Sequence, residues 1–266
     1  MFIYFGYGSN INLASLKAKG VTPVASERGV LPGWRLRFNV QHWFHHEGGV
    51  GNIEPSTNPN DFVEGMVHTC HETDLAALDA VESYGLGYDR IEVDVETSRG
   101  IVSVQTYIGL PGFLDNTCLP TQRYLNIIIK GAEEAGLSPF YIDKLRKNPV
   151  LPETNFPAFI PPPGQWPHFN EQTLALHPEF TALGFAVFDM QQARGKLQGI
   201  IGLLGGKDMT LFFVKRHDTS SGNETDADIK SGNISDGAKE YLNAYMNEFM
   251  NEYKYVGIYD PYRPIK

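Results

Sequence analysis

The feature that most constrains the fold is a proline-rich stretch between the two halves of the chain. Seven prolines lie from Pro149 to Pro167, in the sequence NPVLPETNFPAFIPPPGQWPH. Proline lacks a backbone N–H and fixes φ, so this stretch can be neither a regular helix nor a central strand. It is typical of a semi-rigid linker or an extended arm. We therefore predict a domain at residues 1–148, a linker at 149–168 and a second domain at 169–266.

The composition indicates which kinds of molecule the protein can bind and where it is expected to be located. The chain has 266 residues, of which 42% are apolar and 20% are charged, as in globular proteins. No apolar run approaches the about 18 residues of a membrane span, and no signal peptide is recognisable, so we expect a cytoplasmic location. The net charge of −9 and the lack of a long basic cluster argue against nucleic acid and anionic membranes. The expected partner is a small molecule or a protein, including a second copy in a homodimer.

The first half alternates strand and helix patterns, which is typical of an α+β domain. Strands are predicted in FVEGMVHTC, YDRIEVDVE and GIVSVQTYIG, because apolar residues alternate there with polar ones. Helices are predicted in ETDLAALDAVES and TQRYLNIIIKGAEEAG, where apolar residues recur at helical spacing. A further helix is expected to begin at Pro139, with Ser138 as its cap.

The second half predicts a smaller α+β domain. FTALGFAVFDM is typical of a strand or hairpin, and TSSGNETDADIKSGNIS is typical of a long polar loop. SDGAKEYLNAYMNEFMNEY predicts a long helix that begins after Ser235. The aromatic residues of that helix fall on one stripe, which more often faces a core than a partner.

A strand-to-helix corner near the N-terminus is the first candidate site. The apolar run from Phe2 to Phe5 is followed by GYGSN and then by the helical pattern INLASLKAKG. Glycines let the chain turn sharply, and consecutive N–H groups at such a turn can bind an anion, with the positive end of the next helix adding to the effect. The spacing alone also fits an ordinary tight turn with an asparagine cap.

A carboxylate at the end of a predicted helix is the second candidate. In LDAVESYGLGYDR, Asp79 and Glu82 are three residues apart and share a face of the helix. Glu82 lies where the apolar helix ends, shortly before Tyr88, and a carboxylate placed among aromatic rings suits general acid–base catalysis. A solvated glutamate at a helix surface is the alternative.

Two clusters contain metal-ligand residue types, but neither predicts a metal. One comprises His42, His45, His46 and Glu47, and the other comprises His68, Cys70 and His71. Neither has the paired spacing of a structural zinc site, and a single strand cannot easily direct three ligands to one point. We predict neither a metal nor a cofactor. No nucleophile elbow is present either.

Taken together, the motifs of the first half resemble the γ-glutamylcyclotransferase family. YFGYGSN, GGVGNIEPS, FVEGMVHTC, LDAVESYGLGYDRIEVDV and VSVQTYI follow one another across about residues 3–148. The later stretch YLNIIIKGAEEAGLSPFYIDKL resembles the C-terminal helices of that family. The resemblance implies a small mixed barrel-like sheet with helices around a cavity.

The resemblance also implies an activity and its residues. Family members convert a γ-glutamyl amide to 5-oxoproline by intramolecular aminolysis, a lyase or acyltransferase type of reaction that belongs to glutathione metabolism. By resemblance, Glu82 is the catalytic acid and base. The implied substrate-binding residues are Tyr7, Gly8, Ser9, Asn10, Tyr88 and Tyr107. γ-Glutamyl amino acids, glutathione and γ-glutamylamines all remain candidate substrates, so the leaving amine stays open.

The second half faintly resembles a cytochrome-b5-like domain of the membrane-associated progesterone receptor type. The shared pattern covers about residues 175–259: VFDM, GGKDMT, the long helix and KYVGIY. Ile201 stands where that group has a haem-ligating tyrosine, and His217 lies among polar neighbours. We therefore expect a degenerate domain without haem. Two alternatives stay open for the whole chain: a non-catalytic γ-glutamyl or amino-acid binding protein, and a haem-binding fusion.

Overall fold

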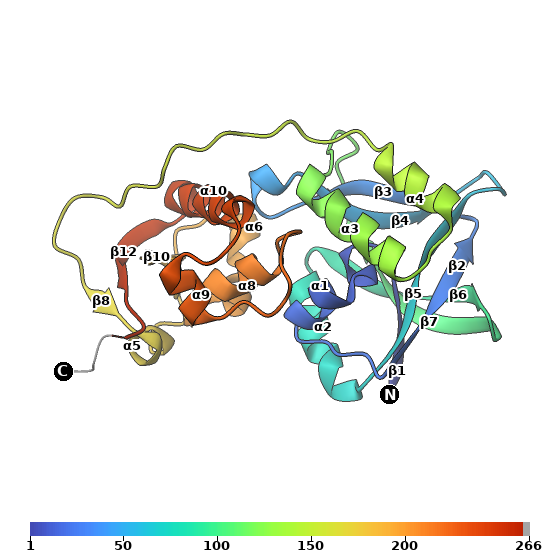
Figure 1. The fold of residues 1–266 in the computed structure, drawn as a ribbon, viewed down its shortest axis with the longest axis horizontal. Helices are drawn as coiled ribbons and strands as arrows, with labels where there is room; N and C mark the ends of the chain where they lie inside the picture. Colours follow the sequence, from blue (N-terminus) through green and yellow to red (C-terminus); the bar gives the residue numbers. More distant parts are fainter. Residues whose placement is uncertain (263–266) are drawn as a thin grey trace. The chain divides into compact units, whose positions relative to one another are not determined.

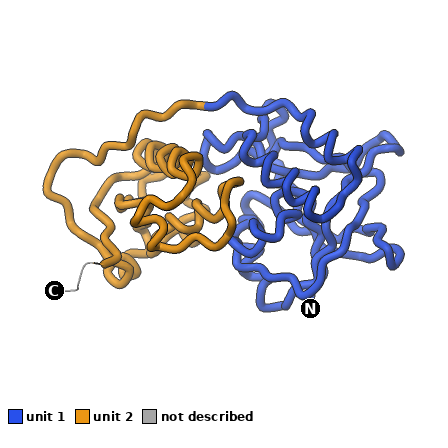
Figure 2. The backbone as a smooth tube through the Cα atoms, in the orientation of Figure 1, with its two compact units in different colours: residues 1–153 blue, residues 154–266 orange. Residues whose placement is uncertain are grey.

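The protein forms two compact units, Met1–Glu153 and Thr154–Lys266, in a computed structural model that describes residues 1–262 (Figure 2). The division falls inside the proline-rich stretch. No helix or strand lies between Arg146 and His168, a segment that the structure describes throughout. The lack of regular structure follows from the missing N–H donors of its prolines.

Unit 1 is built around a closed five-stranded barrel (Figure 1). Its strands follow the order β1-β5-β2-β6-β7. Neighbours pair antiparallel except β7 and β1, which close the barrel with a parallel pairing at Tyr4 and Gln105. The bounds are β1 (Phe2–Gly6), β2 (Ala25–Pro32), β5 (Phe62–Cys70), β6 (Tyr88–Thr97) and β7 (Gly100–Gly109). A separate two-stranded sheet pairs β3 (Trp34–Gln41) with β4 (Gly49–Pro55).

The alternation in the sequence explains the barrel strands. In β6, Val93 and Val95 are buried while Glu92, Asp94 and Glu96 are exposed. A strand with this pattern lays one face on a core and the other in water. The three strands predicted in this half are confirmed as β5, β6 and β7.

The helices of unit 1 begin where side chains can accept from their first N–H groups. Thr121 accepts from the Tyr124 N–H, and Ser138 accepts from the Tyr141 N–H, as expected for N-caps. The bounds are α1 (Leu13–Ala18), α2 (Leu75–Glu82), α3 (Gln122–Glu134) and α4 (Pro139–Arg146). Short 3-10 turns are η1 (Ser9–Ile11), η2 (His45–Glu47), η3 (Glu72–Asp74) and η4 (Pro111–Phe113).

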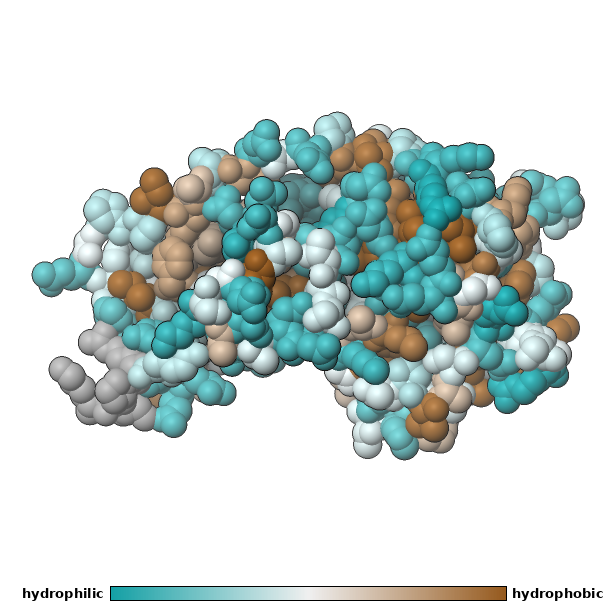
Figure 3. Space-filling model, in the orientation of Figure 1, coloured by the Kyte–Doolittle hydropathy of each residue, from teal (hydrophilic) through white to brown (hydrophobic). Residues whose placement is uncertain are grey.

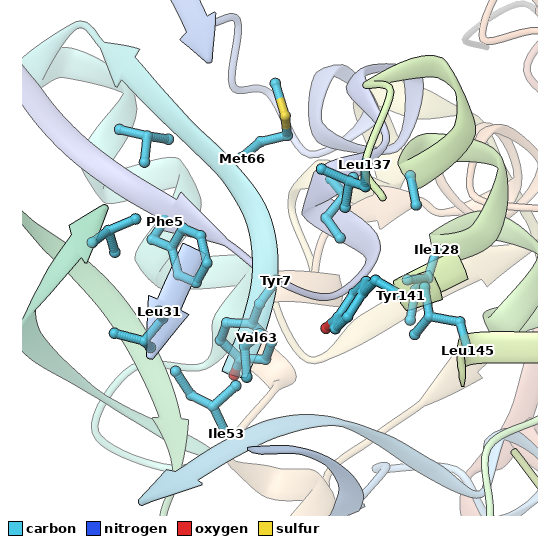
Figure 4. Close-up of a cluster of buried hydrophobic side chains, with 14 of the residues drawn as sticks. Phe5, Tyr7, Leu31, Ile53, Val63, Met66, Ile128, Leu137, Tyr141 and Leu145 are labelled. Atoms are coloured by element: carbon cyan, nitrogen blue, oxygen red, sulfur yellow. The ribbon is translucent and has the colours of Figure 1, made fainter. Parts of the chain in front are cut away.

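The main core of unit 1 lies between the barrel and helices α3 and α4 (Figure 4). Phe5, Leu31 and Val63 come from the barrel, and Ile128 and Leu145 come from the two helices. These side chains are at most 2% exposed, so burial of their apolar surface stabilises the contact between the layers. These contacts fix the positions of α3 and α4 against the barrel.

Gly131 brings α3 close to that chain. A Cβ at this position would lie 2.5 Å from the Asn12 backbone nitrogen, nearer than atoms can approach. Only glycine therefore permits the observed spacing between α3 and the residues between β1 and α1.

Unit 2 is a smaller α+β unit with a five-stranded sheet in the order β11-β9-β10-β12-β8. Its strands are β8 (His168–Phe169), β9 (Phe180–Leu183), β10 (Ala186–Asp189), β11 (Lys207–Asp208) and β12 (Lys254–Tyr259). Its helices are α5 (Glu171–Ala175), α6 (Gly195–Gln198), α7 (Ile201–Leu204), α8 (Thr210–Lys215), α9 (Asp226–Ser231) and α10 (Asp236–Glu252). Tyr245 and Phe249 of α10 are buried, so its aromatic stripe faces the core of unit 2.

One prediction for unit 2 is wrong. The stretch expected to be an uninterrupted polar loop contains α9. Thr225 and Asp228 form a reciprocal capping box at its start, and Gly232 ends it in the left-handed conformation.

The surface carries mixed hydropathy. Hydrophobic side chains are interspersed with hydrophilic ones across the face shown in Figure 3. Within residues 1–262, no helix has both the length and the apolar character needed to cross a bilayer.

Candidate active site

The residues that follow β1 form a compact turn rather than the start of an α-helix. The Ile11 N–H donates to the Gly8 carbonyl over 3.0 Å, which makes the 3-10 turn η1. Helix α1 begins only at Leu13, and its cap is Asn12, whose side chain accepts from the Ser15 N–H. The corner does contain a turn and an asparagine cap, but the capping residue is Asn12. The Asn10 side chain does not cap α1 and instead bonds to Glu82.

Glu82 sits at the last position of α2 because the next residue turns the chain away. Ser83 adopts the left-handed conformation with φ 52°, which ends the helix at once. The Glu82 side chain is only 14% exposed. Its Oε1 atom accepts from Asn10 Nδ2 over 3.0 Å, which joins the two candidate motifs of the sequence in one site.

A buried lysine completes this group. Lys19 Nζ lies 3.2 Å from Glu82 Oε1, 2.6 Å from Asn10 Oδ1 and 3.2 Å from Ser9 Oγ. Asn10 Nδ2 also lies 2.5 Å from the Tyr4 hydroxyl. Lys19 and Tyr4 could not be recognised from the sequence, because a lysine after a short helix and a tyrosine in a strand have no distinguishing local pattern.

Three tyrosines gather beside the turn and β4. Tyr88 donates its hydroxyl to the Gly51 carbonyl over 2.7 Å, and the Gly51 N–H donates to the Tyr124 hydroxyl over 3.1 Å. Tyr7 donates to the Tyr107 carbonyl over 2.6 Å. Sequence reasoning missed Tyr124, although the helix α3 that carries it was predicted.

The tyrosines of the site, including Tyr4, are neutral hydrogen-bonding groups. Burial raises the pKa of Tyr4, Tyr7 and Tyr88 well above its ordinary value, and the negative charge of Glu82 raises it further. Burial also raises the pKa of Tyr124. The site therefore presents phenol groups around one carboxylate, without a phenolate to compete as a base.

Tyr107 and Asp79 belong to a second network. The Tyr107 hydroxyl donates to Asp79 Oδ1 over 2.5 Å, and Arg90 Nη1 lies 2.9 and 3.0 Å from the two Asp79 oxygens. Asp79 is thus paired with a cation, and only Glu82 of the two helix carboxylates meets the turn after β1. The structure places the Tyr107 side chain against α2, where it supports the helix.

His68 holds the turn from behind. Its Nε2 atom lies 3.0 Å from the Asn10 carbonyl, and its Nδ1 atom lies 2.8 Å from Ser26 Oγ. Because the carbonyl can only accept, Nε2 carries the proton and Nδ1 accepts from the serine hydroxyl. Burial lowers the pKa of His68 to about 4. In the described residues 1–262, no group of three or more His, Cys, Asp or Glu side chains is arranged to hold a metal ion.

The neutral His68 predicts a loss of stability in acid. Between pH 6.5 and about 4 the unfolded chain binds a proton at His68 that the folded chain does not bind, so stability falls as the pH falls. The difference between these values corresponds to about 3 kcal/mol. Urea denaturation at pH 7.0 and at pH 4.5 measures this loss of stability. Hydrogen exchange of the β5 amides at the same two pH values measures it locally. His68→Gln keeps a donor near Nε2 without titrating, and it should lose markedly less stability over the same range.

Comparison with known proteins decides the family. A γ-glutamylcyclotransferase of Homo sapiens is 30% identical over 153 residues, which are 54% of this chain and 77% of the human protein. The chain belongs to the γ-glutamylcyclotransferase family. A γ-glutamylcyclotransferase of Mus musculus is 28% identical over the same shares of the two chains, and the AIG2-like family model matches residues 62–145. A solved γ-glutamyl cyclotransferase structure, 29% identical, gives a TM-score of 0.51 and covers 57% of this chain and 90% of its own.

Family membership confirms the barrel-with-helices fold expected for the first half. The relatives support an enzyme of this family in that half of the chain. None of these findings supports a cytochrome-b5-like domain in unit 2. Its residues do not fit a haem either, because Ile201, which stands where that group has its ligating tyrosine, has no donor atom.

Proposed function

We propose that unit 1 converts a γ-glutamyl amide to 5-oxoproline and releases an amine or amino acid. The observation that carries this proposal is the contact between Glu82 Oε1 and Asn10 Nδ2, because it joins a buried carboxylate to the turn after β1. The named activity of the human and mouse relatives supports the same reaction.

The substrate brings its own nucleophile. Its α-amine attacks the γ-carbonyl carbon, a ring C–N bond forms, and the C–N bond to the leaving amine breaks. The enzyme has to hold the γ-glutamyl group curled so that the amine and the carbonyl meet. No nucleophilic side chain is needed for this chemistry.

Glu82 would carry the proton between the two nitrogens. Its carboxylate takes a proton from the α-ammonium, which frees the lone pair for attack, and then gives that proton to the leaving nitrogen. No described residue bonds to Glu82 Oε2, and both contacts of the carboxylate fall on Oε1. Oε2 is therefore the atom that we assign to the substrate ammonium.

The turn after β1 supplies donors for the developing oxyanion. Among the described residues, no acceptor bonds to the backbone N–H groups of Gly8 and Asn10. Donors fixed in a turn stabilise the negative oxygen without reorganising during the reaction. Tyr7 and Tyr88 would line the substrate's binding site beside this turn, and Ser9 would contact the polar head of the substrate.

A panel of substrates tests the proposal. We expect the full chain to form 5-oxoproline from γ-glutamyl amino acids, glutathione or γ-glutamylamines, detected by mass spectrometry. The matched control is the same substrate with an acetylated α-amine, which keeps the γ-glutamyl amide but has no nucleophile and should give no product. Binding of a γ-glutamyl ligand without any product would favour a binding protein instead.

A further inference from the structure

The reaction proposed above leaves one buried charge without a role. Lys19 follows α1, and its side chain is only 5% exposed. Burying an ammonium is costly unless acceptors surround it. The acceptors here are Ser9 Oγ, Asn10 Oδ1 and Glu82 Oε1, at 3.2, 2.6 and 3.2 Å from Nζ. All three belong to the candidate catalytic group rather than to a distant structural partner.

We propose that Lys19 is a positioning residue that fixes the Glu82 carboxylate through Oε1 and turns Oε2 toward the substrate. This inference rests on the proposed cyclisation reaction and adds a residue to it. A carboxylate held by two donors on one oxygen has a defined orientation, whereas a carboxylate held only by Asn10 can rotate.

The geometry distinguishes this positioning role from two others, which are binding of a substrate carboxylate and base catalysis by Lys19 itself. An ammonium has three N–H donors, and the three acceptors around Nζ match that number. Lys19 is therefore not arranged to bind a substrate carboxylate with a remaining donor. As an ammonium it also has no lone pair, so it cannot act as the base in place of Glu82.

The charge of Lys19 matters as much as its hydrogen bonds. The titratable groups that face Glu82 are the cation Lys19 and neutral phenols, namely Tyr4, Tyr7, Tyr88, Tyr107 and Tyr124. The phenols carry no positive charge, so among these groups only Lys19 attracts the Glu82 carboxylate electrostatically. Its removal would take away that attraction together with one of the two contacts on Oε1.

The test compares Lys19→Met, Lys19→Arg and the control Lys17→Met in the full chain. Lys17 lies in α1, two residues before Lys19, and is exposed. For Lys19→Met we expect kcat to fall by about 10- to 100-fold, the size of effect that misplacing a reacting group produces, with KM almost unchanged. Lys19→Arg retains the charge and should recover most of the rate, and Lys17→Met should match the wild type.

Each other outcome overturns the inference in a distinct way. An unchanged kcat in Lys19→Met would leave Lys19 without this role. A raised KM with unchanged kcat would make it a substrate ligand. If Lys19→Met does not fold, Lys19→Gln keeps a donor without the charge, and an unchanged kcat in that variant would also reject the proposal. No product from the wild type would instead reject the cyclisation itself.

Discussion

Glu82→Gln is expected to lower kcat for 5-oxoproline formation by about 10³-fold, within the range that general acid–base groups contribute. The glutamine has the shape of glutamate, and its amide oxygen can still accept from Asn10 Nδ2 and Lys19 Nζ, the two donors that now reach Oε1. It cannot take the proton of the α-ammonium or deliver it to the leaving nitrogen. The loss should therefore fall on kcat, measured by mass spectrometry of 5-oxoproline under saturating substrate.

The control for this variant is Glu134→Gln. Glu134 is the last residue of α3 and is exposed, so the same change of charge there should leave kcat unaltered. Thermal unfolding of both variants checks that the fold is kept. Equal product from Glu82→Gln and the wild type would mean that the reaction occurs but that Glu82 is not its acid and base.

Gly8→Val is expected to reduce kcat/KM by about 10²-fold with a much smaller effect on folding. A Cβ at residue 8 would lie 3.0 Å from the Tyr124 hydroxyl, and the two methyl groups of valine would crowd it further. That hydroxyl accepts from the Gly51 N–H, so its displacement disturbs the tyrosine cluster beside the turn.

Graded variants separate crowding from unfolding. Gly8→Ala adds the single Cβ and should lose less activity than valine. Combining it with Tyr124→Phe removes the hydroxyl that is crowded, and the two changes should be non-additive because they share one contact. A melting temperature that falls in step with activity through this series would mean that the turn is structural rather than a substrate cradle.

Much of unit 1 could be predicted because its signals are local. The alternation in β6 and the caps Thr121 and Ser138 each depend on residues close in sequence. The same holds for Glu82, whose position at a helix end is visible in the motif LDAVES. The motif does not show which of Asp79 and Glu82 contacts the turn after β1. Asp79 pairs with Arg90, and that contact is visible only in the folded barrel.

The residues that were missed depend on long-range contacts. Lys19 is 63 positions from Glu82 in sequence, and His68 is 58 positions from the Asn10 carbonyl that it holds. In the sequence Lys19 looks like its neighbour Lys17, which is exposed. In unit 2, by contrast, a local signal was present and was overlooked. The capping box of Thr225 and Asp228 was a local signal for α9, and the polar composition around it concealed the helix.

The parallel pairing of β7 with β1 sets when this site can form during folding. β1 is made before both of its neighbours, β5 and β7, which end at Cys70 and Gly109. Contacts between residues so far apart close slowly, because the loop between them must first be ordered. While the chain is being synthesised, β1 remains without these partners and its backbone edge is open to pairing with other chains. Aggregation of nascent or truncated chains, rather than loss of catalysis alone, is therefore the expected cost of any change that delays β7.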